Sequence, residues 1–253
     1  MQGNLFTGLN YLSEGFRLII RPGIRPFVII PLLINSVLFG GALWWGYSKV
    51  IELNDAFIGW LPGWLDWLSW ILLPLFFVIA VLAIFYCFSL VANLIASPFN
   101  GYLAEKTEQL LTGEPLGIDN NWKKIVMLVP HSIGRELRKF AYYLPLLIGV
   151  LILMMIPGVN VIATPLWFIL GAWMMSIQYL DYPLDNHELS FGEVKRGAQQ
   201  QRLTSLGFGG VVMLGTMIPL VNLVIMPAAV CGATAYWVRE LKTDFKGELI
   251  NRQ

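Results

Sequence analysis

Three arginines near the start of the chain have the chemistry to bind a tetrahedral anion. Arg17, Arg21 and Arg25 follow residues 8–12, Gly-Leu-Asn-Tyr-Leu, which offer a small residue and backbone donors. A guanidinium presents its donors in a planar fork that makes bidentate contacts with oxyanions. The alternative is that these arginines contact phospholipid headgroups at the basic end of a membrane crossing. The residues alone leave both interpretations open.

A second pattern suited to an anion is a repeated interruption of two apolar segments. The run Ile156-Pro-Gly-Val-Asn160, followed by Pro165, matches Ile218-Pro-Leu-Val-Asn222, followed by Pro227, at a constant offset of 62 residues. A helix that begins near Asn160 or Asn222 would present unpaired N–H groups and the positive end of its dipole at membrane depth. Interrupted repeats of this kind point to the binding region of a transporter. The alternative is that the prolines and asparagines only form the turns of two hairpins.

The two apolar segments, residues 140–180 and 203–238, contain no charged residue and are expected to form re-entrant hairpins. In the second segment, about fifteen residues on each side of the break make limbs of roughly 22 Å at 1.5 Å per residue. A hydrocarbon core of about 30 Å requires nearer twenty residues per crossing. Each hairpin is therefore predicted to enter the membrane, turn inside it and leave by the side that it entered.

The composition places the chain among integral membrane proteins. Of its 253 residues, 57% are hydrophobic and 13% are charged, and the mean hydropathy is +0.65. A single integral membrane domain covering residues 1–253 is expected from these values. The net charge of +1 gives no argument for nucleic-acid binding. Cys87 and Cys231 both lie in apolar runs, where buried and inert thiols are expected.

The remaining elements follow from hydrophobic periodicity and length. Residues 3–20 predict an amphipathic helix in the membrane interface, and residues 26–47 and 67–97 predict two full transmembrane helices. Residues 98–139 predict an amphipathic, cytoplasmic helical segment that contains a helix end at Thr112-Gly113. Ser190 and Glu193 predict a capping box at the start of a short helix. The expected fold is an all-α membrane protein with two transmembrane helices, two re-entrant hairpins, and interfacial and cytoplasmic amphipathic helices.

Basic residues give an orientation for this topology. Only Lys49 lies in the tryptophan-rich loop between the two crossings, and the other lysines and arginines fall on the opposite side. The positive-inside rule then places both termini in the cytoplasm. The basic stretch 121–139 is expected to be a solvated face or a face that contacts lipid headgroups.

The sequence contains no set of residues typical of an enzyme, and no cofactor is expected. Asp181, Asp185, His187 and Glu188 could be written as a metal cluster, but the segment is more typical of a turn with surface hydrogen bonds after a membrane exit. No metal site is therefore predicted. Phosphate-binding loops and the common hydrolase motifs are also missing from the sequence.

Several long motifs resemble the CysZ family of bacterial sulfate permeases. They are Gly8-Leu-Asn-Tyr-Leu12, Arg21-Pro-Gly-Ile-Arg25, Ser97-Pro-Phe-Asn-Gly101 with Leu103-Ala-Glu105, Tyr179-Leu-Asp-Tyr-Pro-Leu-Asp-Asn-His187, and Ile225-Met-Pro-Ala-Ala-Val-Cys-Gly-Ala-Thr234. The resemblance implies a homo-oligomeric permease of the bacterial inner membrane that imports sulfate for assimilation into cysteine. It also implies two full crossings and two hemi-penetrating hairpins. The alternative function is a non-conducting membrane scaffold that recruits assimilation enzymes.

The resemblance also implies site residues. It links sulfate binding to Gly8, Leu9, Asn10, Tyr11, Leu12 and Arg25, and Arg21 stands in for the second of two adjacent arginines because Pro26 occupies that position here. Carboxylates after the second crossing are linked to conduction, which maps onto Glu105 and Glu108. The helix starts at Asn160 and Asn222 complete the expected path. Sulfate, membrane lipid and further copies of the chain are the expected partners.

Overall fold

The computed structural model describes residues 3–60, 67–114, 122–245 and 247, and the regular elements in this part of the chain are helices. They are α1 (Leu5–Ile19), α2 (Arg25–Trp60), α3 (Ser69–Thr112), α4 (Trp122–Met155), α5 (Asn160–Asp185), α6 (Phe191–Gln200), α7 (Arg202–Thr216) and α8 (Pro219–Tyr236). A π-helical turn, Trp237–Leu241, follows α8 directly. The expected all-helical class is thus confirmed for the described residues.

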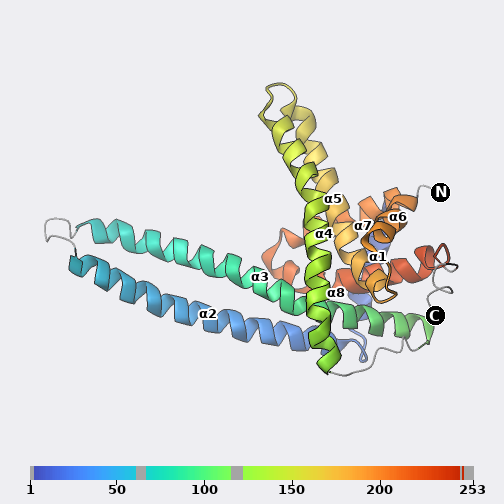
Figure 1. Ribbon diagram of the computed structural model, residues 1–253, viewed down its shortest axis with the longest axis horizontal. Helices are drawn as coiled ribbons and strands as arrows, with labels where there is room; N and C mark the ends of the chain where they lie inside the picture. Colours follow the sequence, from blue (N-terminus) through green and yellow to red (C-terminus); the bar gives the residue numbers. More distant parts are fainter. Residues whose placement is uncertain (1–2, 61–66, 115–121, 246, 248–253) are drawn as a thin grey trace. The chain divides into compact units, whose positions relative to one another are not determined.

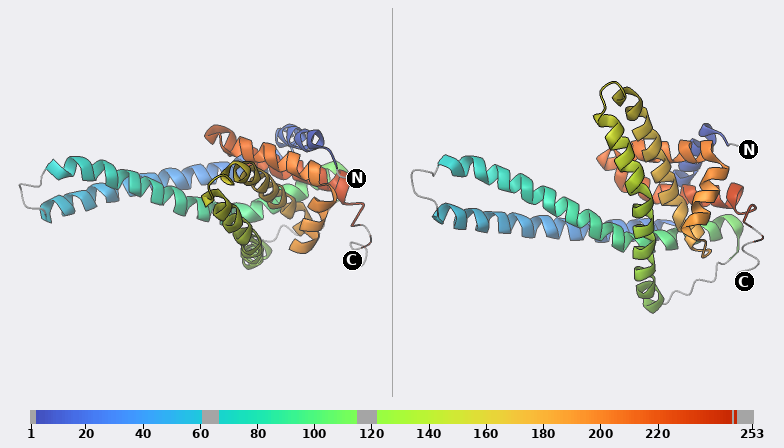
Figure 2. Two further views of the ribbon diagram at one scale, coloured as in Figure 1. Left: turned by 90° about the horizontal axis from the view of Figure 1, so that it is seen from above. Right: turned by 45° about the horizontal axis from the view of Figure 1, so that its top comes forward.

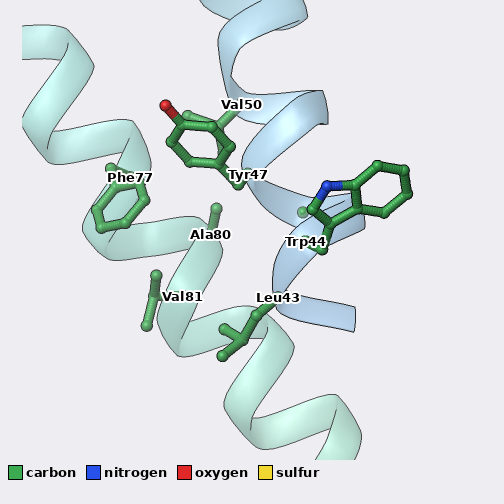
Figure 3. A pocket seen from close by; sticks show the side chains of 8 residues that line it. Leu43, Trp44, Tyr47, Val50, Phe77, Ala80 and Val81 are labelled. Carbon is green, nitrogen blue, oxygen red and sulfur yellow. The ribbon is translucent and has the colours of Figure 1, made fainter. Parts of the chain in front are cut away.

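The chain divides into two compact units, and the smaller of them, Ile29–Ala96, is an antiparallel pair formed by parts of α2 and α3. The two helices run side by side in every view of Figures 1 and 2. Leu43, Tyr47 and Val50 of α2 face Phe77 and Val81 of α3 around an apolar pocket (Figure 3). The rings of Tyr47 and Phe77 meet edge to face, with centroids 6.4 Å apart.

Both helices of this pair are longer than the crossings expected from the sequence. α2 has 36 residues and continues to Trp60, well past the expected end at residue 47, and α3 has 44 residues and continues through Pro98 to Thr112. An ion pair between Lys49 and Glu52 supports the extension of α2, because residues three apart lie on one face of a helix. Residues 61–66 of the tryptophan-rich loop and residues 115–121 of the expected cytoplasmic segment lie outside the described part of the chain.

The larger unit, Met1–Val28 and Ser97–Gln253, is organised around α1, which packs against α7 and α8. Glycines allow the backbones to approach. A Cβ at Gly8 would lie 2.3 Å from the backbone of α7, and a Cβ at Gly15 would lie 2.0 Å from the carbonyl oxygen of Ala228 in α8. Gly209 of α7 makes a similar backbone contact with Ala172 of α5. Small residues at helix crossings are typical of membrane bundles, where close van der Waals packing replaces the hydrophobic effect.

The two copies of the sequence repeat form different turns. After α4, residues 156–159 make a turn in which Gly158 has φ +85°, a left-handed conformation that favours glycine. Leu220 occupies the matching position in the second copy, and there α8 begins earlier, with Pro219 at its first position. Proline suits that position because its fixed φ is helical and its missing N–H has no partner there. One glycine therefore accounts for the longer turn of the first copy.

Helix lengths in the first repeat differ from the expected short limbs. Among the described residues, two stretches are long and apolar enough to cross a membrane, Ile133–Met155 with 23 residues and Asn160–Asp185 with 26. They form the antiparallel pair α4–α5, and the turn that joins the two helices lies at the top of Figure 1. The second repeat gives α7 with 15 residues and α8 with 18. The expected limb length of about fifteen residues therefore fits α7 and α8 better than it fits α4 and α5.

Candidate functional site

The segment 8–12 lies in the middle of α1, and its two faces have different surroundings. Gly8, Tyr11 and Leu12 are buried against α7 and α8, whereas Leu9 and Asn10 are exposed. The N–H of Gly8 donates to the carbonyl oxygen of Asn4, as expected inside a helix. The backbone donors that the sequence offered are therefore occupied within the helix, and the glycine provides a close helix contact.

Tyr11 connects α1 to the end of α8. Its ring stacks on the ring of Tyr236, with centroids 5.1 Å apart, and its hydroxyl donates to Glu240 Oε1 over 2.8 Å. Burial and the neighbouring Glu240 carboxylate raise the pKa of the Tyr11 hydroxyl well above its usual value, so it stays protonated and acts as a donor. Tyr11 thus serves as a buried link between two elements.

Arg21 lies in the turn between α1 and α2, Arg25 is the first residue of α2, and both are exposed. The N–H of Arg25 donates to the carbonyl oxygen of Arg21 over 3.1 Å, a helical i to i+4 bond. The Arg25 Nε also donates to the carbonyl oxygen of Ile20. The two arginines that the sequence selected are therefore joined by a backbone hydrogen bond, and both residues are exposed.

The two asparagines expected at helix starts occupy different positions. Asn160 is the first residue of α5, whereas Asn222 lies in the first turn of α8, three residues after Pro219. Val159 and Ile218 are the cap residues, and neither makes a side-chain cap bond. The N–H of Asn222 is bonded to the carbonyl oxygen of Ile218 over 2.8 Å. The prediction of a helix start near these residues holds for Asn160, and it is displaced by about one turn for Asn222.

A buried network of charges joins α4 to α5. Arg135 makes a two-pronged contact with Asp181 through Nε and Nη2, and Lys139 Nζ lies 3.1 Å from Asp181 Oδ2. Asp181, Arg135 and Lys139 are only 3%, 6% and 2% exposed. Arg135 also pairs with Asp185 over 2.7 Å and donates to the carbonyl oxygen of Leu189. We call these four residues, Arg135, Lys139, Asp181 and Asp185, the α4–α5 charge network.

This network corrects two interpretations of the sequence. α5 continues through Asp181 to Asp185, so Asp181 forms buried ion pairs and Asp185 a partly buried one, instead of surface hydrogen bonds in a turn. Arg135 and Lys139 lie in the basic stretch that was expected to face solvent or headgroups. Their spacing of four residues matches that of Asp181 and Asp185, and this match is the signal that sequence reasoning missed.

A second buried cluster surrounds Glu108 in the last part of α3. The Glu108 side chain is fully buried, and Oε1 lies 2.8 Å from Lys242 Nζ and 3.0 Å from His187 Nε2. Burial would raise the pKa of Glu108, but hydrogen bonds and charges from His187 and Lys242 together outweigh it and lower the pKa below its usual value. Glu105, one turn earlier, is also buried at 4% exposure. Sequence reasoning did not select Lys242.

The segment that ends α5 holds both clusters in place. Asn186 Nδ2 donates to the carbonyl oxygen of Gly101 in α3 over 2.9 Å, and the next residue, His187, contacts Glu108. Glu188 then takes φ +57°, which reverses the chain towards α6. Among the described residues, no group of three or more His, Cys, Asp or Glu side chains could hold a metal ion.

Beside its apolar core, this unit exposes large apolar side chains and buries several charges. Met155 and Val161 are 84% and 74% exposed, whereas the charges of the α4–α5 network are inside. Soluble monomers rarely expose large contiguous apolar surfaces, and ionisable groups within membrane segments face the interior and pair with one another. Together with the two candidate spans, this pattern defines an α-helical integral membrane protein.

Comparison with known proteins gives the family. A model of the family described as sulfate transporter CysZ/etoposide-induced protein 2.4 matches residues 11–227. The sulfate transporter CysZ of Pseudomonas syringae pv. tomato is 47% identical over 244 residues, which cover 96% of each chain. The CysZ proteins of Vibrio cholerae and Pectobacterium atrosepticum are 47% and 46% identical over 96% and 92% of this chain, and over 98% and 84% of their own. The chain belongs to the CysZ/EI24 family, a transporter family, and it is not an enzyme.

Proposed function

We propose that this chain is a sulfate permease that imports inorganic sulfate across the inner membrane of a bacterium for assimilation into cysteine. The observation that carries the proposal is the near full-length similarity, at 45–47% identity, to proteins named sulfate transporter CysZ. The exposed apolar side chains and buried charges of the larger unit support a membrane location. The two arginines of the α1–α2 turn supply chemistry suited to a tetrahedral dianion.

The proposed sulfate contacts come from Arg21 and Arg25. Both residues are exposed, so each side chain can form charge-assisted hydrogen bonds with a bound anion. The helical segment made of Gly8, Leu9, Asn10, Tyr11 and Leu12 belongs to the same proposed site. Its N–H groups are used inside α1, so its contribution is to fix α1 on α7 and α8 and thereby to position the turn.

The proposed path continues through Glu105 and Glu108 and past the starts of α5 and α8 near Asn160 and Asn222. Two full crossings within α2 and α3 and two re-entrant pairs, α4–α5 and α7–α8, form the proposed topology. The uncharged part of α4 beyond Lys139 has about sixteen residues, or roughly 24 Å, which is less than a bilayer core. The 26 residues of α5 are the observation that weighs against this topology for the first pair.

A homo-oligomer is part of the proposal, because two crossings and two hairpins are little material to enclose a hydrophilic route. Exposed apolar side chains on α2 and α3, such as Leu33 and Ile79, offer surface for other copies or for lipid. Chemical cross-linking in native membranes should trap oligomers. If it finds only monomers while uptake is intact, the oligomer is ruled out.

Sulfate titration of the purified protein tests the proposed site. Arg25→Ala and Arg21→Ala should each weaken sulfate affinity by about tenfold, the equivalent of roughly 1.4 kcal/mol for a charge-assisted hydrogen bond. Arg138→Ala, at an exposed arginine of α4, is the matched control and should leave the affinity unchanged. Unchanged affinity in both turn variants would show that the site lies elsewhere. A chain that binds sulfate but does not carry it into liposomes would instead favour the non-conducting scaffold.

A further inference from the structure

The π-helical turn Trp237–Leu241 and the residue after it form ion pairs and a hydrogen bond with α1 and α3. Arg239 forms an ion pair with Glu14 of α1, and Glu240 accepts the hydrogen bond from Tyr11 of α1. Immediately after the turn, Lys242 pairs with Glu108 of α3. Three residues of the segment 239–242 therefore bind α1 and α3, two helices that are far apart in the sequence.

The turn itself is held by its own backbone and by buried rings. The N–H of Lys242 donates to the carbonyl oxygen of Trp237 over 2.8 Å, which closes the wide i to i+5 ring of a π-helix. The Trp237 side chain is fully buried between His187 and Phe245, with ring centroids 5.3 and 5.8 Å away. This register directs Arg239 and Glu240 to α1 and Lys242 to α3. Single π-helical turns are frequently found at functional sites.

The two helices that the turn joins carry the two ends of the proposed site. α1 leads directly into Arg21 and Arg25, and Glu108 belongs to the proposed path. Lys242 and His187 satisfy both carboxylate oxygens of Glu108, so the tail fixes the charge and direction of that side chain. Neither Lys242 nor Glu240 is part of the family motifs found in the sequence.

We propose that residues 237–242 are a clasp that couples α1 to Glu108, with Glu240 and Lys242 as positioning residues for sulfate translocation. The proposal rests on the proposed function as a sulfate permease. The ion pairs and hydrogen bond of the clasp described above reach Glu14, Tyr11 and Glu108 and not Arg21 or Arg25, so its loss should leave sulfate binding intact. Its loss should instead disturb the alignment of the binding turn with the path, and transport should slow.

Lys242→Met and Lys242→Arg test the clasp in reconstituted liposomes. Lys242→Met should lower maximal sulfate uptake at least fivefold while the sulfate Kd stays within twofold of the original. Lys242→Arg should restore uptake to within twofold, because a guanidinium also pairs with a carboxylate. Lys106→Met, on the same helix as Glu108, is the control and should transport normally. Uptake by Lys242→Met equal to that of the unchanged protein would overturn the clasp, as would failure of Lys242→Arg to restore it.

A second pair of variants tests whether the clasp acts as one unit. Tyr11→Phe removes the hydroxyl that binds Glu240 and keeps the stacked ring. Combined with Lys242→Met, it should slow uptake no more than the stronger single variant, because both changes open the same clasp. Multiplied defects would contradict a single unit. The hydrogen-exchange rate of α1 amides is a second measurement that does not depend on transport. This rate should increase in Lys242→Met. An unchanged rate would overturn the clasp even if the chain carried no sulfate.

Discussion

Gly8 of α1 lies directly against the backbone of Phe208 in α7, so that a Cβ at residue 8 would be 2.3 Å from the Phe208 nitrogen. The carbonyl oxygen of Thr204 is equally close. No flexible side chain is available to move at this contact. The glycine of the 8–12 motif is therefore required by the approach of two helices, whether or not the segment also contacts sulfate.

Gly8→Ala should destabilise the protein by about 1–3 kcal/mol or prevent its folding, because overpacking against backbone atoms forces α1 away from α7. Thermal unfolding in detergent and the yield of monodisperse protein measure the effect. Gly149→Ala is the matched control, since a Cβ at that helical glycine meets nothing within 4 Å. It should stabilise α4 by up to about 1 kcal/mol. Equal stabilities of the two variants would contradict the packing role of Gly8.

Asp181→Asn should cost about 3 kcal/mol or more of stability. The change leaves Arg135 and Lys139 buried without their shared carboxylate, and removal of one partner of a buried ion pair is strongly destabilising. Glu52→Gln removes the partner of Lys49 in an exposed pair and should cost less than about 1 kcal/mol. Unfolding by denaturant measures both changes. A loss as small as that of Glu52→Gln would mean that the α4–α5 network carries no stability.

Glu108 should make the docking of the tail sensitive to acid. Its pKa is lowered in the folded state from the ordinary value of 4.5, so its contribution is fully present above about pH 4.5. The contribution is lost as the pH falls through the lower folded pKa, where the carboxylate takes up a proton beside His187 and Lys242. The stability difference between the unchanged protein and Glu108→Gln should therefore be constant above about pH 5 and shrink below about pH 4. A difference that grows on acidification would have the wrong sign.

Local signals in the sequence predicted several helix ends correctly. The capping box at Ser190 and Glu193 is present at the start of α6, and Gly113, with φ +75°, follows the last residue of α3. These ends depend on neighbouring residues alone. The end of α2 was not predicted correctly. The composition changes from apolar to mixed after residue 47, but such a change does not by itself end a helix, and α2 continues to Trp60.

The charge clusters depend on residues that are distant in the sequence. Asp181 lies 46 residues from Arg135, and Glu108 lies 134 residues from Lys242. Composition alone gave no reason to pair them, so the basic stretch 121–139, whose residues 122–139 form the first half of α4, was assigned to solvent or headgroups. Arg21 and Arg25 could be grouped from the sequence because they are only four residues apart, and a backbone hydrogen bond joins them; their role in sulfate binding stays a prediction.

Cysteine labelling tests whether the two repeats turn inside the membrane. In a background lacking Cys87 and Cys231, Ile156→Cys and Ile218→Cys place thiols at the two exposed turns. Gly59→Cys, near the tryptophan-rich loop, is the positive control, since a Cβ there meets nothing within 4 Å. A bulky, impermeant thiol reagent added outside should label residue 59 and neither turn. Labelling of residue 156 as efficient as that of residue 59 would show that α4 and α5 cross completely, as their lengths permit.

Uptake of radiolabelled sulfate by liposomes that contain only this purified chain tests the central claim most directly. The proposed function predicts saturable uptake above that of protein-free liposomes, reduced by excess unlabelled sulfate and weakened in Arg25→Ala at low sulfate concentration. Normal folding of each preparation is checked by its thermal unfolding. Uptake no greater than in protein-free liposomes, from a folded protein that still binds sulfate, would contradict the assignment of this chain as a sulfate permease.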